Sequence, residues 1–182
     1  MKRHYFIGIP IPAQVEEIAD KFKKEYSLRR YYKVLTYRDD LHVTLLYLGA
    51  VEAQQLPFVK NQLAEIAKKT TSFSLSINGL SYFGSKSDPR VIYLAIDENL
   101  SLTHLQQKIN ASIPSLLGIP KTDRFVPHIT IAKKRKTQEN LDIEKQTITP
   151  IEVSVPSFSL FTIYPEKLPK YEAIATFSCL TL

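Results

Sequence analysis

One short pattern occurs twice in this chain and restricts the folds that the chain can adopt. Residues 42–45 read His-Val-Thr-Leu and residues 128–131 read His-Ile-Thr-Ile. Such alternation is typical of a strand with one polar and one apolar face, because side chains two residues apart point to the same side. The pattern therefore predicts two strands whose apolar faces are covered and whose histidines and threonines face a polar space.

Further helices and strands are expected around both copies of the pattern. Apolar residues at the spacing of one helical face predict helices over 13–26, 56–67 and 102–113, the last with Ser101 as its N-cap. Alternating and short apolar runs predict strands over 5–11, 34–37, 41–48, 73–77, 91–96, 125–132, 151–155, 158–163 and 173–180. Strands and helices thus recur in both halves, and each half holds one copy of the pattern.

This recurrence predicts a single domain, 1–182, with two similar lobes. The chain is long enough to bury a substantial core, and no linker separates two independent units. A turn at 84–90 divides the chain into lobes of roughly 1–85 and 86–182. The last strand could cross back to the first lobe, and the sequence alone leaves that open.

Composition limits the partners and the cellular location. The formal net charge of +6, from 24 Lys and Arg against 18 Asp and Glu, favours polyanionic partners such as nucleic acid, although many ordinary proteins share it. No window approaches the roughly 18 apolar residues of a membrane span. The single cysteine, Cys179, excludes an intramolecular disulfide and is expected as a small buried residue in a late strand. These features predict a reducing, cytoplasmic location.

Two facing histidine–threonine pairs would supply the groups that phosphodiester chemistry requires. A histidine exchanges a proton near neutral pH, and a threonine hydroxyl donates a hydrogen bond to an anionic oxygen. One imidazole can take a proton from the nucleophile while the other protonates the leaving oxygen, without a metal ion. A single copy of the pattern would more often be structural, but two copies among four histidines favour function. The other two, His4 and His104, lack the threonine and are expected to be structural.

With these two motifs, the chain resembles the 2H phosphoesterases, which are named for two His-x-Thr/Ser-x motifs. More closely, it is similar to the RNA 2',3'-cyclic phosphodiesterases, once called 2'-5' RNA ligases. "LHVTLLYLGAV" and "FVPHITIAKK" resemble the two motifs, and "RHYFIGIPIPAQVEEI" resembles the opening strand and helix. "FSLSINGLSYFGSKSDPRVIYLAI" and the ending "SFSLFTIYPEKLPKYEAIATFSCLTL" extend the resemblance to nearly the whole chain.

The resemblance implies an α+β fold of two lobes, with antiparallel sheets around a central cleft and helices on the outside. It implies hydrolysis of a 2',3'-cyclic phosphate, on RNA ends or small nucleotides, to a 2'-phosphate. No cofactor, metal, membrane or obligate protein partner is implied. His42 would be the proton donor to the 3' oxygen and His128 the base that activates water, while Thr44 and Thr130 would hold the non-bridging oxygens. The order of acid and base comes from the family alone.

A basic run follows the second motif and adds one candidate phosphate ligand. Relatives often carry arginine where this chain has Lys133, and lysine keeps the charge but loses bidentate geometry. Lys133 is therefore a candidate for phosphate binding. Lys134, Arg135 and Lys136 are weaker candidates, because a charge run commonly solvates the end of a strand.

Two aromatic residues near the motifs could stack on a nucleobase. Tyr47 lies at an odd offset from His42, so an uninterrupted strand would place it in the core. Phe125 also lies at an odd offset from its histidine, but Pro127 can break that register. Arg124 is a candidate for the RNA backbone or is simply exposed.

Other functions fit the same residues. The fold could act on 2'-5' linked oligonucleotides, as a phosphodiesterase or a reversible ligase, or on ADP-ribose cyclic phosphate. It could also be an RNA-binding module without turnover. Replacement of either motif histidine by alanine separates the enzymes from the binding module.

Overall fold

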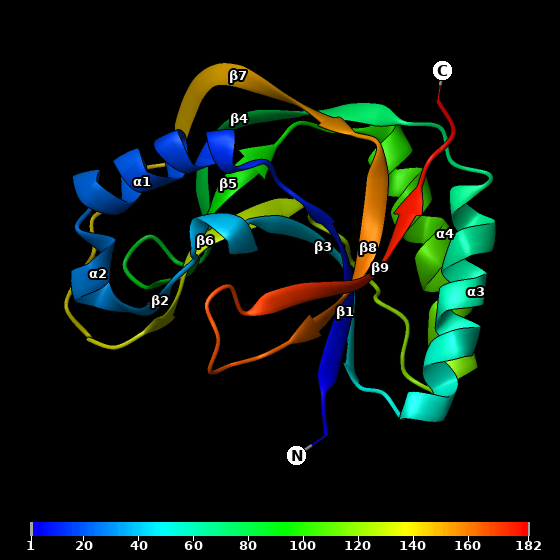
Figure 1. Cartoon of the computed structure of the whole chain (residues 1–182). Helices are drawn as coiled ribbons and strands as arrows, with labels where there is room; N and C mark the ends of the chain where they lie inside the picture. Colours follow the sequence, from blue (N-terminus) through cyan, green and yellow to red (C-terminus); the bar gives the residue numbers. More distant parts are fainter. Residues whose placement is uncertain (1, 182) are drawn as a thin grey trace.

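The computed structural model describes residues 2–181, which form one antiparallel sheet with helices packed against it (Figure 1). The strands are β1 (His4–Pro10), β2 (Tyr32–Leu35), β3 (His42–Ala50), β4 (Phe73–Gly84), β5 (Pro89–Ile96), β6 (His128–Arg135), β7 (Gln146–Val155), β8 (Ser157–Ile163) and β9 (Tyr171–Ser178). The helices are α1 (Glu16–Glu25), α2 (Leu28–Tyr31), α3 (Leu56–Ala67) and α4 (Leu100–Leu117), with short 3-10 helices η1 (Ala13–Val15), η2 (Arg38–Asp40) and η3 (Ala53–Gln55). The predicted α+β class is confirmed.

The two motif strands are neighbours in the middle of the sheet. The strand order is β7-β4-β5-β6-β3-β1-β8-β9, and β2 pairs with β6 as an additional strand. One residue pair, Val43 with Ile129, joins β3 to β6, and β2 then pairs with the later part of β6. Residues that are far apart in the sequence therefore meet at this one seam.

The predicted lobes, roughly 1–85 and 86–182, stay a prediction. Strands from the two predicted lobes alternate in the sheet. β4 of the first lobe lies between β7 and β5 of the second, and β8 and β9 of the second lobe continue the sheet from β1 of the first. β8 thus pairs with β1, and the last strand, β9, pairs with β8 at the edge on the side of β1, a crossing that the sequence left open.

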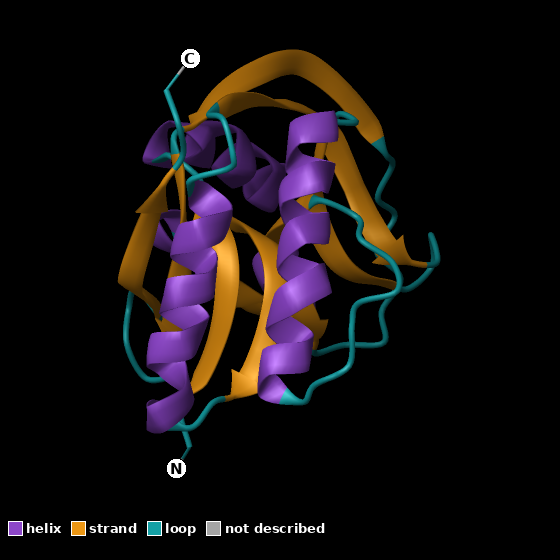
Figure 2. Cartoon of the chain, turned by 90° about the vertical axis from the view of Figure 1, so that its right-hand side faces the viewer, coloured by secondary structure: helices purple, strands orange, loops and turns teal. Residues whose placement is uncertain are grey.

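Two pairs of helices cover different parts of the sheet. α3 and α4 lie side by side against one face (Figure 2), while α1 and α2 lie at the opposite end of the molecule, near β6 and β2 (Figure 1). The predicted helical periodicity is confirmed in α4, where Leu102, Leu105, Ile109 and Ile113 are buried. Burial of each such side chain stabilises the fold by about 1.5–3 kcal/mol. No helix within residues 2–181 is both long and apolar enough to cross a membrane.

Local details differ from three expectations. The N-cap of α4 is Asn99 rather than Ser101, because the Asn99 side chain accepts a hydrogen bond from the Leu102 N–H at 2.9 Å. Cys179 lies one residue beyond β9 and is only partly buried. β6 begins at His128 rather than at 125, since Pro127 has no N–H to donate to the ladder.

Candidate active site

A β-bulge interrupts the first motif strand directly after its threonine. Along the β1–β3 ladder, Gly8 pairs with Thr44 and Ile7 pairs with Leu46, so Leu45 is an extra residue. Both Leu45 and Leu46 are buried, and the alternation of faces shifts by one position beyond them. Tyr47 consequently returns to the face that carries His42.

The second motif strand contains a bulge at the equivalent position. Along the β5–β6 ladder, Tyr93 pairs with Thr130 and Ile92 pairs with Ala132, so Ile131 is the extra residue. Ile131 and Ala132 are both buried. Lys133 therefore returns to the histidine face, just as Tyr47 does five residues after the first histidine.

This shift makes the prediction for Tyr47 wrong. An uninterrupted strand would bury Tyr47 in the core, but the side chain is 54% exposed because the bulge reverses its direction. Its hydroxyl shares a hydrogen bond with the Nδ1 atom of His4 at 2.6 Å. A one-residue bulge leaves no clear signal in an apolar run such as Leu45-Leu46, so sequence alternation alone could not detect it.

Packing around the first bulge leaves little room for change. A Cβ atom added to Gly8 would lie 2.8 Å from the Val43 carbonyl oxygen, so β1 can approach β3 this closely only with glycine at that position. On the other side, the buried Gln106 amide of α4 donates a long hydrogen bond, 3.5 Å, to the Leu45 carbonyl. The extra residue thus has a partner outside the ladder.

The two motif histidines are held by the same kind of hydrogen bond. The Nδ1–H of His42 donates to the Asp40 carbonyl at 2.7 Å, and the Nδ1–H of His128 donates to the Val126 carbonyl at 2.7 Å. A carbonyl oxygen can only accept, so Nδ1 carries the proton and Nε2 is the nitrogen left to exchange one. The Nε2 atom of His42 lies 3.0 Å from the Thr44 hydroxyl oxygen.

The seam between β3 and β6 brings both predicted pairs together. Because the strands are antiparallel and Val43 pairs with Ile129, His42 lies across from Thr130 and His128 lies across from Thr44. Opposite Cβ atoms in such a pair are about 4.5–5.5 Å apart. Each motif therefore places its threonine next to the other motif's histidine.

Aromatic rings enclose both imidazoles. The His42 ring lies 4.7 Å from the Phe6 ring and 4.9 Å from the edge-on Tyr171 ring, measured between centroids. The His128 ring lies 4.9 Å from Phe83 and 5.2 Å from Tyr93. These rings restrict the imidazole planes and reduce their contact with water, and nothing in the sequence marked them as part of the site.

This enclosure lowers the pKa of both histidines. Burial, which disfavours the charged imidazolium, is the main cause and lowers the pKa of His42 to about 4. Burial also lowers the pKa of His128, and the positive charge of Lys133 adds to the effect on both rings. The hydrogen bonds to the backbone carbonyls act in the opposite direction but are weaker. Both imidazoles are therefore neutral near pH 7 in the free protein.

The basic run after the second motif divides into different environments. Lys133 is half-buried, and burial together with the charges of Lys134 and Lys170 lowers its pKa. Lys134 is exposed with a left-handed backbone, φ 63°. Arg135 stacks on Tyr31 and Tyr32 and lies 3.5 Å from an Asp88 carboxylate oxygen. Lys133 is the member of the run that joins the histidine face.

A cavity of about 590 Å³ opens at one end of the motif strands, and we call it the aromatic cleft. Tyr47 and Phe125 both contribute to its lining, together with the predicted backbone ligand Arg124. Other side chains that line it are Thr44, Tyr82, Phe83, Tyr93, His128 and Lys145. Aromatic surfaces with nearby cations are typical of sites for single-stranded nucleic acid.

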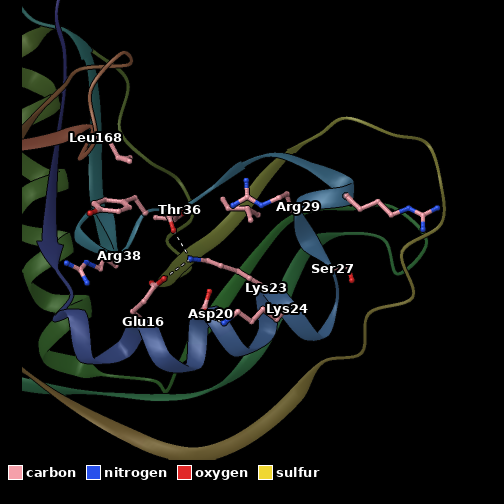
Figure 3. A pocket seen from close by; sticks show the side chains of 12 residues that line it. Glu16, Asp20, Lys23, Lys24, Ser27, Arg29, Thr36, Arg38 and Leu168 are labelled. Atoms are coloured by element: carbon pink, nitrogen blue, oxygen red, sulfur yellow. Dashed lines mark hydrogen bonds and ion pairs between the residues drawn. The ribbon is translucent and has the colours of Figure 1, made fainter.

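Two further spaces lie at the other end of the motif strands. A small space that we call the connecting pocket is lined by Val34, Leu35, Thr36, Tyr37, Asp40, Lys133, Leu168, Lys170 and Tyr171. It adjoins a larger space of about 800 Å³, the cationic groove, which is lined by Glu16, Asp20, Lys23, Lys24, Ser27, Arg29, Arg30, Leu35, Thr36, Tyr37, Arg38 and Leu168 (Figure 3). Neither motif histidine lines the groove, and the connecting pocket lies between the groove and the Tyr171 ring that packs on His42.

Asp40 is a positioning residue that no sequence motif marks. Its buried carboxylate accepts the backbone N–H groups of Lys170 and Tyr171, each at 3.0 Å, while its carbonyl accepts from His42. Asp40 thus fixes the start of β9, and with it the Tyr171 ring, against the His42 imidazole. Its partners are about 130 residues away along the chain, so no local pattern could identify them.

The comparisons with known proteins identify the family. The model of the 2'-5' RNA ligase superfamily matches residues 10–164. The chain belongs to this superfamily. This confirms the predicted resemblance.

Curated members of the superfamily match nearly the whole chain. The RNA 2',3'-cyclic phosphodiesterase of Bacillus subtilis is 30% identical, and the match covers 97% of both chains. The RNA 2',3'-cyclic phosphodiesterase of Geobacillus stearothermophilus is 32% identical over 99% of this chain. This chain spans only 59% of the length of that second relative.

Two solved structures share the fold. The protein TT0787 of Thermus thermophilus matches with a TM-score of 0.80 at 23% identity, covering 96% of this chain and 97% of that one. LigT of Escherichia coli, solved with 3'-AMP, matches with a TM-score of 0.79 at 19% identity, covering 98% and 99%. These likenesses confirm the arrangement of strands and helices.

We expect Asp40→Ala to destabilise the fold, because it leaves two backbone N–H groups without their charged acceptor. The free energy of unfolding should fall by about 3 kcal/mol, the scale of one to two hydrogen bonds to a charged group. Urea denaturation measures this change. The matched control is Asp39→Ala, which removes an exposed carboxylate 3.6 Å from Arg38 and should cost less than about 1 kcal/mol. Equal losses in both variants would contradict the assigned role of Asp40.

Proposed function

We propose that the protein hydrolyses the 2',3'-cyclic phosphate at the end of an RNA strand and leaves a 2'-phosphate. The observation that carries this proposal is the pairing of two Nδ1-bonded histidines with two threonines across one strand seam. The names of the curated relatives, RNA 2',3'-cyclic phosphodiesterases, support the same reaction. RNA ends and small cyclic-phosphate nucleotides are the proposed substrates, and the cytoplasm is the proposed location.

The proposed reaction needs one base and one acid on opposite sides of the phosphorus atom. The Nε2 atom of His128 takes a proton from water, and the resulting hydroxide forms a bond to phosphorus. The bond from phosphorus to the 3' oxygen breaks, and His42 gives its Nε2 proton to that oxygen. The product carries a free 3' hydroxyl and a 2'-phosphate. The two histidines have nearly equivalent surroundings, so their geometry does not distinguish the acid from the base. The order of acid and base is therefore taken from the family resemblance.

The phosphate itself supplies the protonation state that the acid requires. His42 is neutral in the free protein near pH 7, since burial lowers its pKa to about 4. A phosphodiester anion beside the ring favours the imidazolium and raises this pKa again. Thr44 and Thr130 donate hydrogen bonds to the non-bridging oxygens, and Lys133 adds a positive charge on the same face. The acid thus becomes charged only where a substrate is bound.

The aromatic cleft provides a place for the terminal nucleobase. Tyr47 and Phe125 offer ring faces on which a base can stack, and such stacking contributes about 1–3 kcal/mol per base. Arg124 and Lys145 place positive charge at the same cleft. Stacking tolerates every base, so the proposed enzyme selects the phosphate end rather than the sequence.

We expect alanine at either motif histidine to abolish most of the hydrolysis. His42→Ala and His128→Ala should each lower kcat/KM by about 10²–10⁴-fold, the usual contribution of a general acid or base. The assay uses an oligonucleotide with a 2',3'-cyclic phosphate in EDTA, with separation of 2'- from 3'-phosphate products and circular dichroism to verify folding. The control His104→Ala removes an exposed histidine of α4 and should leave the rate unchanged.

Full activity in both motif variants would overturn the assignment of acid and base. A 3'-phosphate product would overturn the proposed regiochemistry, and inhibition by EDTA would point to a metal-bound hydroxide instead. Tight RNA binding without turnover in the unmodified protein would favour the RNA-binding module.

The profile of kcat/KM against pH should be bell-shaped with its maximum below pH 6.5. Below both pKa values no imidazole is free to act as base, and above both values no imidazolium remains to act as acid. Both pKa values are lowered from 6.5 in the free protein, so the maximum between them lies below 6.5.

The Lys133→Gln variant should shift the maximum of the same pH profile. The charge of Lys133 lowers the pKa of both histidines, so its removal should move the maximum to higher pH. The Lys134→Gln control removes a neighbouring, exposed charge and should leave the maximum in place. A wild-type maximum at or above pH 7 would contradict the lowered pKa values.

A further inference from the structure

The cationic groove continues the proposed active site away from the aromatic cleft. The connecting pocket contains Lys133 and Tyr171 and shares four lining residues with the groove: Leu35, Thr36, Tyr37 and Leu168. Tyr171 packs edge-on against the His42 ring, so the connecting pocket begins beside the proposed acid. The aromatic cleft instead begins at Thr44 and His128. The site thus has the aromatic cleft, with the cations Arg124 and Lys145, at one end and the cationic groove at the other.

The wall of the groove is built by a buried lysine. Lys23 is almost fully buried, and its Nζ donates to the Thr36 carbonyl at 2.7 Å and lies 3.3 Å from a Glu16 oxygen (Figure 3). The hydrogen bond to Thr36 fastens α1 to the segment between β2 and η2, and the ion pair with Glu16 lies within α1. The groove therefore has a fixed wall, and the exposed side chains of Arg29 and Arg38 also line the groove.

Positive charge predominates along the groove and the connecting pocket. Their linings hold seven Lys and Arg against three Asp and Glu, which gives a formal net charge of 7 − 3 = +4. Four of the five cations of the groove lie within 4 Å of a carboxylate: Lys23, Lys24, Arg30 and Arg38, the last 3.6 Å from Asp39. Arg29 has no carboxylate within 4 Å among residues 2–181. A single-stranded nucleic acid, with one negative charge per nucleotide, complements such a surface.

We propose that the cationic groove binds the RNA strand that leads up to the terminal cyclic phosphate. The proposal rests on the function proposed above and specifies how the protein holds the longer of its substrates, single-stranded oligoribonucleotides. Only the last nucleotide reacts, so the rest of the strand must leave the site. With the terminal base in the aromatic cleft, the strand crosses the surface past Lys133 and Lys170, over the connecting pocket, which at about 30 Å³ is too small to hold a nucleotide. Arg29 and Arg38 then contact the phosphates beyond it.

The test compares two substrates in one double variant. Arg29→Ala/Arg38→Ala should lower kcat/KM on the order of tenfold for a hexanucleotide with a 2',3'-cyclic phosphate, because two phosphate contacts are lost. The rate on a 2',3'-cyclic mononucleotide should not change. The dependence of log kcat/KM on log salt for the hexanucleotide should become shallower by about 1.4, from about 0.7 per contact on a single strand. The control Lys60→Ala/Lys69→Ala removes one charge in α3 and one just after it, and should change kcat/KM for neither substrate.

Equal loss on both substrates, or no loss on the hexanucleotide, would overturn the groove as the RNA path. Fluorescence anisotropy with a labelled hexanucleotide that ends in a 2'-phosphate measures binding without turnover. The arginine variant should bind this probe more weakly and the lysine variant should not, and equal affinities would again overturn the proposal. If the unmodified protein binds the probe through the arginines but hydrolyses neither substrate, the proposed function fails while the groove stands.

Discussion

The pairing of Val43 with Ile129 is the contact on which the rest of the site depends. This pair joins β3 to β6 at the middle of the sheet and sets the register of two motifs that are 86 residues apart. Both side chains are fully buried, so their burial stabilises the seam directly. Because the strands are antiparallel, one register places each histidine across from the other motif's threonine. A slip of one residue in either strand would turn that strand's histidine and threonine toward the core.

The two bulges give the site both its symmetry and its asymmetry. Each one lies directly after the threonine and returns the fifth residue after the histidine to the polar face. On β3 that residue is Tyr47, at the aromatic cleft, and on β6 it is Lys133, at the connecting pocket. The histidines themselves have matching hydrogen bonds, so these two residues provide a physical difference between the ends of the site. Such a difference is what an asymmetric substrate needs in order to bind in one orientation.

Much of this arrangement could be predicted from the sequence, because it follows from strand alternation. The strands and long helices, and the shared face of each histidine and threonine, all obey period-2 or period-3.6 patterns. The direction of Tyr47 could not be predicted, since it depends on a bulge within a uniformly apolar run. The role of Asp40 depends on backbone groups of Lys170 and Tyr171, which only the folded chain brings near. The sequence predicted what alternation determines and missed what tertiary contacts determine.

The most direct test of this account is the protonation pattern of the two motif histidines, measured by ¹⁵N NMR of the imidazole nitrogens. In the free protein at pH 7, both rings should be neutral, with the proton on Nδ1 and none on Nε2, because Nδ1 donates to a backbone carbonyl in each motif. Signals are assigned with the two alanine variants. A neutral ring with its proton on Nε2, or an imidazolium at either position in the free protein at pH 7, would contradict the account.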